Sequence, residues 1–330
     1  MEARPTWYER GWGILKVVIF LVSCWFIWLH VDREIKTVGD SGRLFLRLFG
    51  NDHQALLFWL VLLLAFVNWS LEALKWKFLI SKTEEVSFVK ALRAFFNGIT
   101  LSFFTPNRVG EFAGRVIYLR RENTIRGALL TFIGSAAQLL ITIQCGTLAA
   151  IVYIERFLEV SATTLLLIRL ALVIIFLVST WSWWKMPKLV KLTDRLNIRH
   201  SLKEKAHIWD SCTSGDLLRV WGLSFLRYGV FTLQSVLLLR IVEVPASFAE
   251  LAGLTALSYF FITLIPSIAL GELGIRGSVN LALFGYAGAL PSDILPATFA
   301  LWAINLALPA LFGAASVLFL KIRKHTEGRK

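Results

Sequence analysis

Two short stretches place Pro, Gly, Glu and Arg residues inside strongly apolar sequence. The first covers residues 105–115 and includes Glu111 and Arg115, and the second covers residues 266–276 and includes Glu272 and Arg276. Each reads Pro, then Gly-Glu, then an Arg four residues after the Glu. Guanidinium groups bind phosphate through paired N–H donors, and a carboxylate can orient them or exchange a proton. The two motifs therefore predict a site for a phosphate-bearing ligand.

The spacing of the charged residues places them on common helix faces. In a helix that starts after Pro106, Arg108, Glu111 and Arg115 share one face, and a second helix would align Glu272 and Arg276. Asn280 extends that second face. These six side chains are the predicted substrate-binding residues. The alternative is that each Glu–Arg pair only neutralises itself, but a charge within a bilayer costs at least ~2.5–3.5 kcal/mol, which favours a functional role.

Proline and glycine within these motifs are expected to interrupt the helices. A break exposes backbone N–H groups at the start of the next helix, where an anion is stabilised. The predicted break residues are Pro106, Gly110, Gly114, Pro266, Gly271 and Gly274.

The composition indicates an all-α, polytopic membrane protein. The 330 residues are 56% hydrophobic, and the mean hydropathy is +0.65, well above the values of soluble domains. We therefore expect one integral membrane domain over residues 1–330, with membrane lipids as its partners. The net charge of +13 is better explained by the positive-inside rule and anionic headgroups than by nucleic acid.

Apolar runs of spanning length recur along the chain. The predicted spans are residues 12–30, 55–80, 127–153, 162–184, 217–241 and 294–320. Residues 31–54 are expected to form an interfacial helix, and Lys75, Trp76 and Lys77 to mark the snorkelling end of the second span. The basic connection 185–216 and the basic C-terminus are predicted to be cytoplasmic, in a multi-pass protein of the cell inner membrane.

Shorter apolar segments flank each motif. Residues 91–104 and 108–120 surround the first motif, and residues 249–265 and 273–288 surround the second. The halves of the first pair are too short to cross a bilayer, and segment length leans the same way for the second pair, which predicts two re-entrant broken-helix pairs. Basic residues flank only the first pair, so the pairs should open to opposite sides, as in an inverted repeat with halves 55–184 and 217–320. Two full crossings have the same parity, and that alternative stays open.

Signals for catalysis or for a cofactor are weak. The three cysteines and five histidines form no metal-binding pattern, and no nucleophile or nucleotide-binding motif is present. We therefore predict no metal, no cofactor and no catalytic residues. Glu72, Arg169 and Arg227 lie in apolar runs as weaker candidates, each with a possible structural role. Buried amides such as Gln138 and Asn305 are expected to hold helices together.

At the two motifs the chain resembles the transmembrane-domain family of lysylphosphatidylglycerol synthase, also described as flippase-like or UPF0104-type membrane proteins. That family typically shows P-G-R-x-G-E in its first third and P-x-x-x-G-G-x-G-x-R-E in its last third. Here Asn107 replaces the first Gly, Glu272 occupies a Gly position, and Gly277 stands where the family has Glu. The second carboxylate has thus moved by about one turn, and the soluble transferase domain is missing. The resemblance implies lipid translocation or an accessory role.

Three hypotheses follow. The first is a flippase that moves an anionic or headgroup-modified lipid, or a lipid-linked precursor, between leaflets. The second is a membrane enzyme acting on a lipid phosphate, with the Glu and Arg residues as acid and electrophile. The third is a non-catalytic scaffold for a separately encoded lipid-modifying enzyme. The lack of a nucleophile favours the first over the second. It does not exclude the third.

Overall fold

In the computed structural model, every regular element of the described residues is helical. The structure describes residues 25, 51–103, 105, 109–194, 212–265 and 269–318. The elements of these ranges are α3 (Asp52–Ile80), α4 (Phe88–Ser102), α5 (Gly110–Val116), η2 (Arg121–Asn123), α6 (Thr124–Tyr153), η3 (Ile154–Arg156), α7 (Ala162–Asp194), α9 (Ser214–Ile241), α10 (Phe248–Leu264), α11 (Ala269–Tyr286), α12 (Pro291–Trp302), η4 (Ala303–Ala307) and α13 (Leu308–Leu318). The all-α prediction is confirmed for these residues.

Five of the described helical segments are long and apolar enough to cross a membrane. They are Asp52–Ile80, Arg121–Arg156, Ala162–Met186, Ser214–Ile241 and Pro291–Ser316. Each overlaps one of the predicted spans, so a multi-pass membrane protein is supported. The predicted span 12–30 and nearly all of the interfacial segment 31–54 lie outside the described residues.

The basic connection predicted at 185–216 is partly helical. Helix α7 ends at Asp194 rather than near residue 184, and α9 begins at Ser214. Lys185 and its successors therefore continue the helix instead of opening a loop, because nothing in this stretch except Pro187 opposes helix formation. A capping box between Thr213 and Asp216 defines the start of α9.

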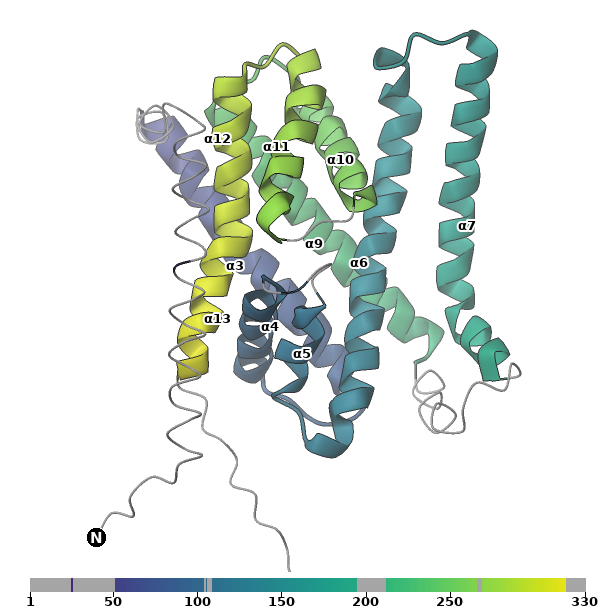
Figure 1. Ribbon diagram of the computed structural model, residues 1–330, viewed down its shortest axis with the longest axis vertical. Helices are drawn as coiled ribbons and strands as arrows, with labels where there is room; N and C mark the ends of the chain where they lie inside the picture. The colour runs from purple at the N-terminus through teal and green to yellow at the C-terminus, as the bar shows by residue number, and fades with distance from the viewer. Residues whose placement is uncertain are drawn as a thin grey trace, which may run out of the picture.

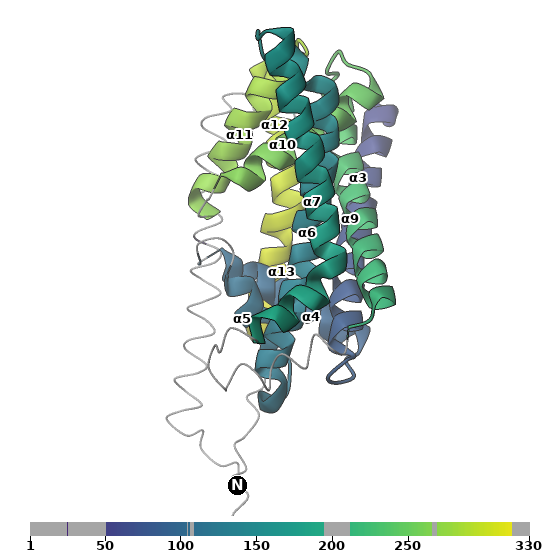
Figure 2. The ribbon, with the colours of Figure 1, turned by 90° about the vertical axis from the view of Figure 1, so that its right-hand side faces the viewer.

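The four shorter helices form two pairs in different halves of the molecule. Figure 1 shows α4 and α5 in the lower half and α10 and α11 in the upper half, and Figure 2 shows the same separation after a quarter turn. At 1.5 Å per residue, α4 is about 22 Å long and α11 about 27 Å, both less than the roughly 30 Å of a hydrocarbon core. Hydroxyl N-caps start each pair, Ser87 before α4 and Ser247 before α10.

Glycine allows α4 and α5 to approach each other closely. A Cβ on Gly114 would lie 2.5 Å from the backbone oxygen of Asn97, and one on Gly110 would lie 2.2 Å from that of Leu101. On the other helix, Gly98 faces Glu111 in the same way. This is the small-residue packing typical of membrane helices. It brings α5 against the interior side of α4.

The last span contains a π turn in its middle. Helix α12 passes into η4 at Ala303, and α13 begins at Leu308. Pro309 explains the widened turn, because it has no N–H to donate to the carbonyl of Asn305 four residues earlier. The π turn places Asn305 among buried groups of the interior.

A polar contact joins the loop before α4 to the turn after α5. Glu84, in the loop after α3, accepts hydrogen bonds from the Arg120 N–H and from Asn123 Nδ2, both at 2.9 Å, and pairs with Lys90 at 3.4 Å. Burial alone would raise the pKa of Glu84, but these hydrogen bonds and Lys90 hold it below its ordinary value.

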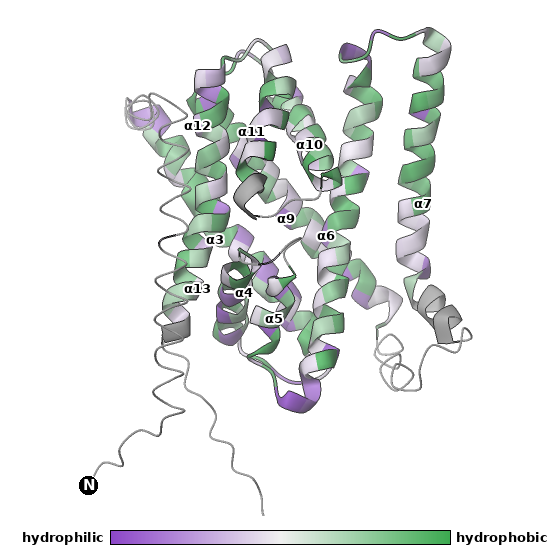
Figure 3. Cartoon of the chain, in the orientation of Figure 1, coloured by the Kyte–Doolittle hydropathy of each residue, from purple (hydrophilic) through white to green (hydrophobic). Residues whose placement is uncertain are grey.

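Helix α7 stands at the edge of the bundle. It packs mainly on α6, and none of its most apolar window is buried. Figure 3 shows it as mostly hydrophobic, whereas hydrophilic residues occur at helix ends and where α3, α5 and α9 come together. The outer surface therefore suits lipid, and the polar groups lie inside.

Candidate functional site

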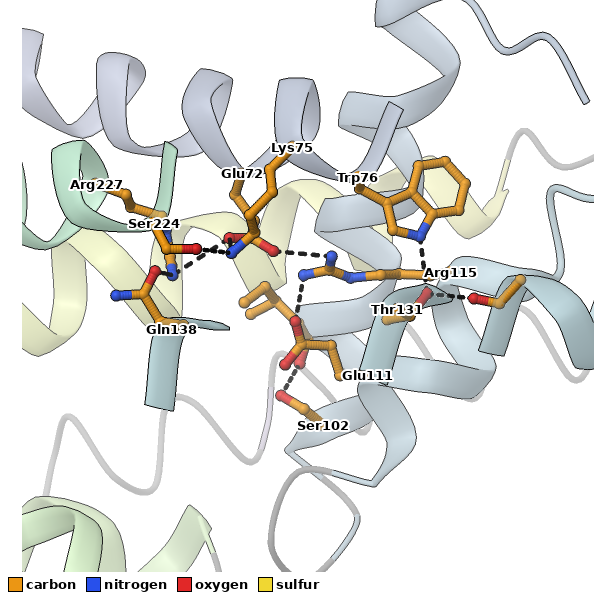
Figure 4. Close-up of polar contacts among 12 residues, drawn as sticks. Glu72, Lys75, Trp76, Ser102, Glu111, Arg115, Thr131, Gln138, Ser224 and Arg227 are labelled. Atoms are coloured by element: carbon orange, nitrogen blue, oxygen red, sulfur yellow. Dashed lines mark hydrogen bonds and ion pairs between the residues drawn. The ribbon is translucent and has the colours of Figure 1, made fainter. Parts of the chain in front are cut away.

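A cluster of charged side chains lies buried where α3, α5 and α9 meet (Figure 4). At its centre, Glu72 of α3 is 4% exposed. Its Oε2 lies 2.8 Å from Lys75 Nζ and 3.3 Å from an Arg227 nitrogen, and its Oε1 accepts a 2.9 Å hydrogen bond from Arg115. One carboxylate thus contacts three cations, which compensates part of the cost of burying them.

The first motif supplies two members of this cluster. Arg115, only 2% exposed, contacts Glu72 through one terminal nitrogen and Glu111 through the other. Glu111 and Arg115 are four residues apart on α5, so the helical spacing predicted from the sequence brings them together. The guanidinium also lies over the ring of Phe95, 5.9 Å from its centroid. Arg115 is therefore held by α5, α3 and α4 together.

The predicted snorkelling end of the second span is wrong for Lys75 and Trp76, whereas Lys77 is half-buried. Lys75 and Trp76 are each 1% exposed. Lys75 donates to Ser224 of α9 as well as pairing with Glu72, and Trp76 Nε1 donates to Thr131 of α6 at 2.9 Å. Packing against α6 and α9 encloses this turn of α3.

Arg227 connects the cluster to a cavity. Its guanidinium contacts Glu72 and donates to Gln138 of α6 at 3.2 Å, and its side chain remains 23% exposed. With three cations against the carboxylates of Glu72 and Glu111, the described cluster carries a formal charge of +1. The excess positive charge lies next to the cavity that Arg227 lines.

The cavity lies mainly within the second half of the chain, and Asn68 and Ile99 of the first half contribute to its wall. Its polar lining comes from α3, α9, α10, α11 and the last span. These side chains are Asn68, Arg227, Ser235, Ser258, Tyr259, Arg276, Asn280, Thr298 and Asn305. Apolar residues such as Ile262 and Trp302 complete the wall. A cavity with two guanidinium groups and several amides and hydroxyls can hold an anion with hydrogen-bonding substituents.

The second motif contributes Arg276 and Asn280 to this cavity. Asn280 accepts a hydrogen bond from Ser258 and donates one of 2.8 Å to Thr298, so it also ties α11 to α10 and α12. Glu272 lies on α11, but its side chain is outside the described residues, and Arg108 lies wholly outside them. The structure thus places Arg276 and Asn280 in one cavity and Glu111 and Arg115 in the adjoining cluster.

Several predicted helix breaks are wrong. Gly114 lies within α5, and Gly271 and Gly274 lie within α11. Gly110, by contrast, is the first residue of α5 after the interruption that follows α4. Gly110 and Gly114 also allow close packing on α4. Pro106 and Pro266 lie outside the described residues.

The residues that join the two motifs are those ranked lower from sequence. In the sequence, Glu72 and Arg227 each stand as a single charge in an apolar run, and Lys75 is expected at the membrane surface. Arg169, the third weaker candidate, lies away from the cluster, where it pairs with Glu155 at 2.6 Å. Glu72 and Lys75 at i and i+3 inside a spanning segment were the available signal.

Among the residues that the structure describes, no group of His, Cys, Asp and Glu is arranged to hold a metal ion. A comparison with protein families matches residues 13–313 to the family described as Lysylphosphatidylglycerol synthase TM region. The search of curated proteins returns no match. Because the match covers both motifs and all the described helices except the end of the last one, the chain belongs to the lysylphosphatidylglycerol synthase transmembrane-region family.

Proposed function

We propose that this protein carries an anionic lipid between the two leaflets of its membrane. The observation that carries the proposal is the cavity lined by Arg227 and Arg276, in which Arg227 is also ion-paired to Glu72 of the buried cluster. A phosphate entering the cavity would meet two cations and offset the positive charge of the cluster. Family membership supports a lipid-related role.

The two short helix pairs suggest how such a site could serve both leaflets. In our proposal, α4–α5 and α10–α11 are re-entrant pairs of an inverted repeat, entering from opposite sides. Their separation into two halves of the molecule supports this arrangement (Figure 1). The cavity uses residues from α10 and α11 and from Ile99 of α4. A small movement of either pair would then open the cavity toward one side.

Flipping of fluorescent phospholipids in proteoliposomes tests the proposal. Vesicles that contain the protein should transfer the labelled phospholipids between leaflets faster than empty vesicles do. Arg227→Gln should reduce the rate by about 10- to 100-fold, because a charge-assisted hydrogen bond contributes about 1.5–3 kcal/mol. Arg169→Gln is the matched control, since it removes a cation whose partner is the partly exposed Glu155. It should leave the rate within about twofold.

A second test compares the transport rates of the wild type and an Arg115→Lys variant. Arg115 uses its two terminal nitrogens on two different carboxylates, which a lysine cannot do. Arg115→Lys should therefore lose most of the transport rate while retaining the charge. No acceleration by folded wild-type protein, across anionic and zwitterionic lipids, would reject the carrier and favour a scaffold for a separate enzyme.

A further inference from the structure

Glu72 shares one of its carboxylate oxygens between two cations. Its Oε2 lies 2.8 Å from Lys75 Nζ and 3.3 Å from an Arg227 nitrogen, while its Oε1 accepts a 2.9 Å hydrogen bond from Arg115. The contact with Arg227 is the longest of these three ion pairs (Figure 4). Because the attraction between charges falls with distance, Lys75 interacts with Glu72 Oε2 more strongly than Arg227 does.

Arg227 also differs from the other two cations in its exposure and its position. The Arg227 side chain is 23% exposed, whereas those of Lys75 and Arg115 are each 2% exposed. Arg227 lines the cavity, and neither Lys75 nor Arg115 belongs to the described lining. Among the described members of the cluster, Arg227 is therefore the cation that a ligand in the cavity can contact.

The cluster remains balanced when Arg227 turns toward the cavity. Its other described members are two carboxylates, Glu72 and Glu111, and two cations, Lys75 and Arg115. Both oxygens of Glu72 keep a partner, Oε2 at Lys75 and Oε1 at Arg115. A buried carboxylate oxygen that lost its cation would be strongly destabilising. Lys75 prevents that loss at Oε2.

We propose that Arg227 exchanges Glu72 for a phosphate oxygen of the ligand, and that Lys75 is the positioning residue that permits this exchange by holding Glu72 Oε2. The proposal rests on the proposed function and concerns how its site binds and releases the ligand. Arg227 has an anionic partner before and after the exchange, so neither arrangement buries an unpaired guanidinium. Gln138 accepts a 3.2 Å hydrogen bond from Arg227 and favours the arrangement beside Glu72.

Native mass spectrometry of the purified full-length protein in detergent tests the exchange, with phosphatidylglycerol as the probe. Diacylglycerol with the same acyl chains measures the binding that does not involve phosphate. Lys75→Met should weaken phosphatidylglycerol binding by about tenfold, because Glu72 Oε2 then depends on Arg227 and holds it more strongly. Gln138→Leu should strengthen binding by about two- to fivefold, because Arg227 loses an acceptor beside Glu72. General damage to the fold would weaken binding in both variants.

A double-mutant cycle separates the exchange from the simple loss of a positive charge near the cavity. In an Arg227→Gln background, Lys75→Met should change the affinity by less than about twofold, because the residue through which Lys75 acts is gone. Lys82→Met is the matched control. Lys82 follows α3 and pairs with Asp216 at 2.8 Å, outside the described cavity lining, so this variant should also leave the affinity within about twofold.

The outcomes separate the exchange from the carrier function. Unchanged affinity in Lys75→Met, or an equal loss in the wild-type and Arg227→Gln backgrounds, overturns the exchange even where the protein flips lipid. If Lys75→Met does not fold, unchanged or weaker binding by Gln138→Leu overturns the exchange by itself. The predicted coupling without lipid flipping supports the exchange and rejects the carrier function. The same coupling in calorimetric titrations with inorganic phosphate, but not with phosphatidylglycerol, supports the exchange and assigns it to a soluble phosphate.

Discussion

Replacing Glu72 by Gln should destabilise the protein more than any comparable change at the surface. The carboxylate contacts Lys75, Arg115 and Arg227 within 3.3 Å, and its removal raises the formal charge of the described cluster from +1 to +2. Removing one partner of a buried ion pair typically costs about 3–5 kcal/mol, because the remaining charge stays buried and unbalanced. Because the amide of Gln has the same shape as the carboxylate, the packing is kept, and the decrease in the free energy of unfolding measures the effect of the charge.

The assay is reversible unfolding in mild detergent, followed by tryptophan fluorescence, since Trp76 lies beside the cluster. Glu155→Gln is the control, because its carboxylate is 64% exposed and pairs with Arg169; it should change the free energy of unfolding by less than about 1 kcal/mol. Adding Lys75→Met to Glu72→Gln returns the cluster to +1 and should recover part of the loss. If Glu72→Gln costs no more than Glu155→Gln, the cluster is not a buried electrostatic unit.

Three further predictions concern packing, acidity and topology. Gly114→Ala should destabilise the protein by about 1–3 kcal/mol through overpacking, whereas Gly222→Ala, with open space around it, should be neutral or stabilising by up to about 1 kcal/mol in the same unfolding assay. The lowered pKa of Glu84 means that its stabilising effect is present above its ordinary value of 4.5 and is lost as pH falls through the folded-state value. Wild type and Glu84→Gln should therefore differ in unfolding free energy at pH 7 and converge in acid; a constant difference would contradict this. Single cysteines beside Arg120 and Ala289 should react with impermeant maleimide from opposite sides of the membrane, and labelling from one side would remove the inverted repeat.

The sequence predicts the positions of most of the helices but not the side-chain contacts between them. Apolar length identifies spans because hydrocarbon thickness sets it. The pairing of Glu111 with Arg115 also follows from local spacing. The burial of Lys75, by contrast, depends on α9 packing across α3, and the role of Arg227 depends on Glu72, which is far away in the sequence. Long-range packing of this kind has no local signature.

The position of Gly114 shows a related limit. Glycine beside proline in a membrane segment is consistent with a break, and also with a close helix crossing. Only the approach of the α4 backbone, at Asn97, distinguishes the two. The sequence motif therefore identified the correct segment but assigned Gly114 the wrong structural role.

The order in which the charged helices are synthesised has a consequence for membrane insertion. Helix α3 carries Glu72 and Lys75 as an internal pair, and α5 carries Glu111 with Arg115, so each can enter the bilayer partly neutralised. Arg227 on α9 has its carboxylate partner on α3, more than a hundred residues earlier in the chain. Stable integration of α9 therefore depends on α3 remaining next to the translocon until α9 is inserted. A nascent chain without Glu72 should insert α9 into the lipid less efficiently.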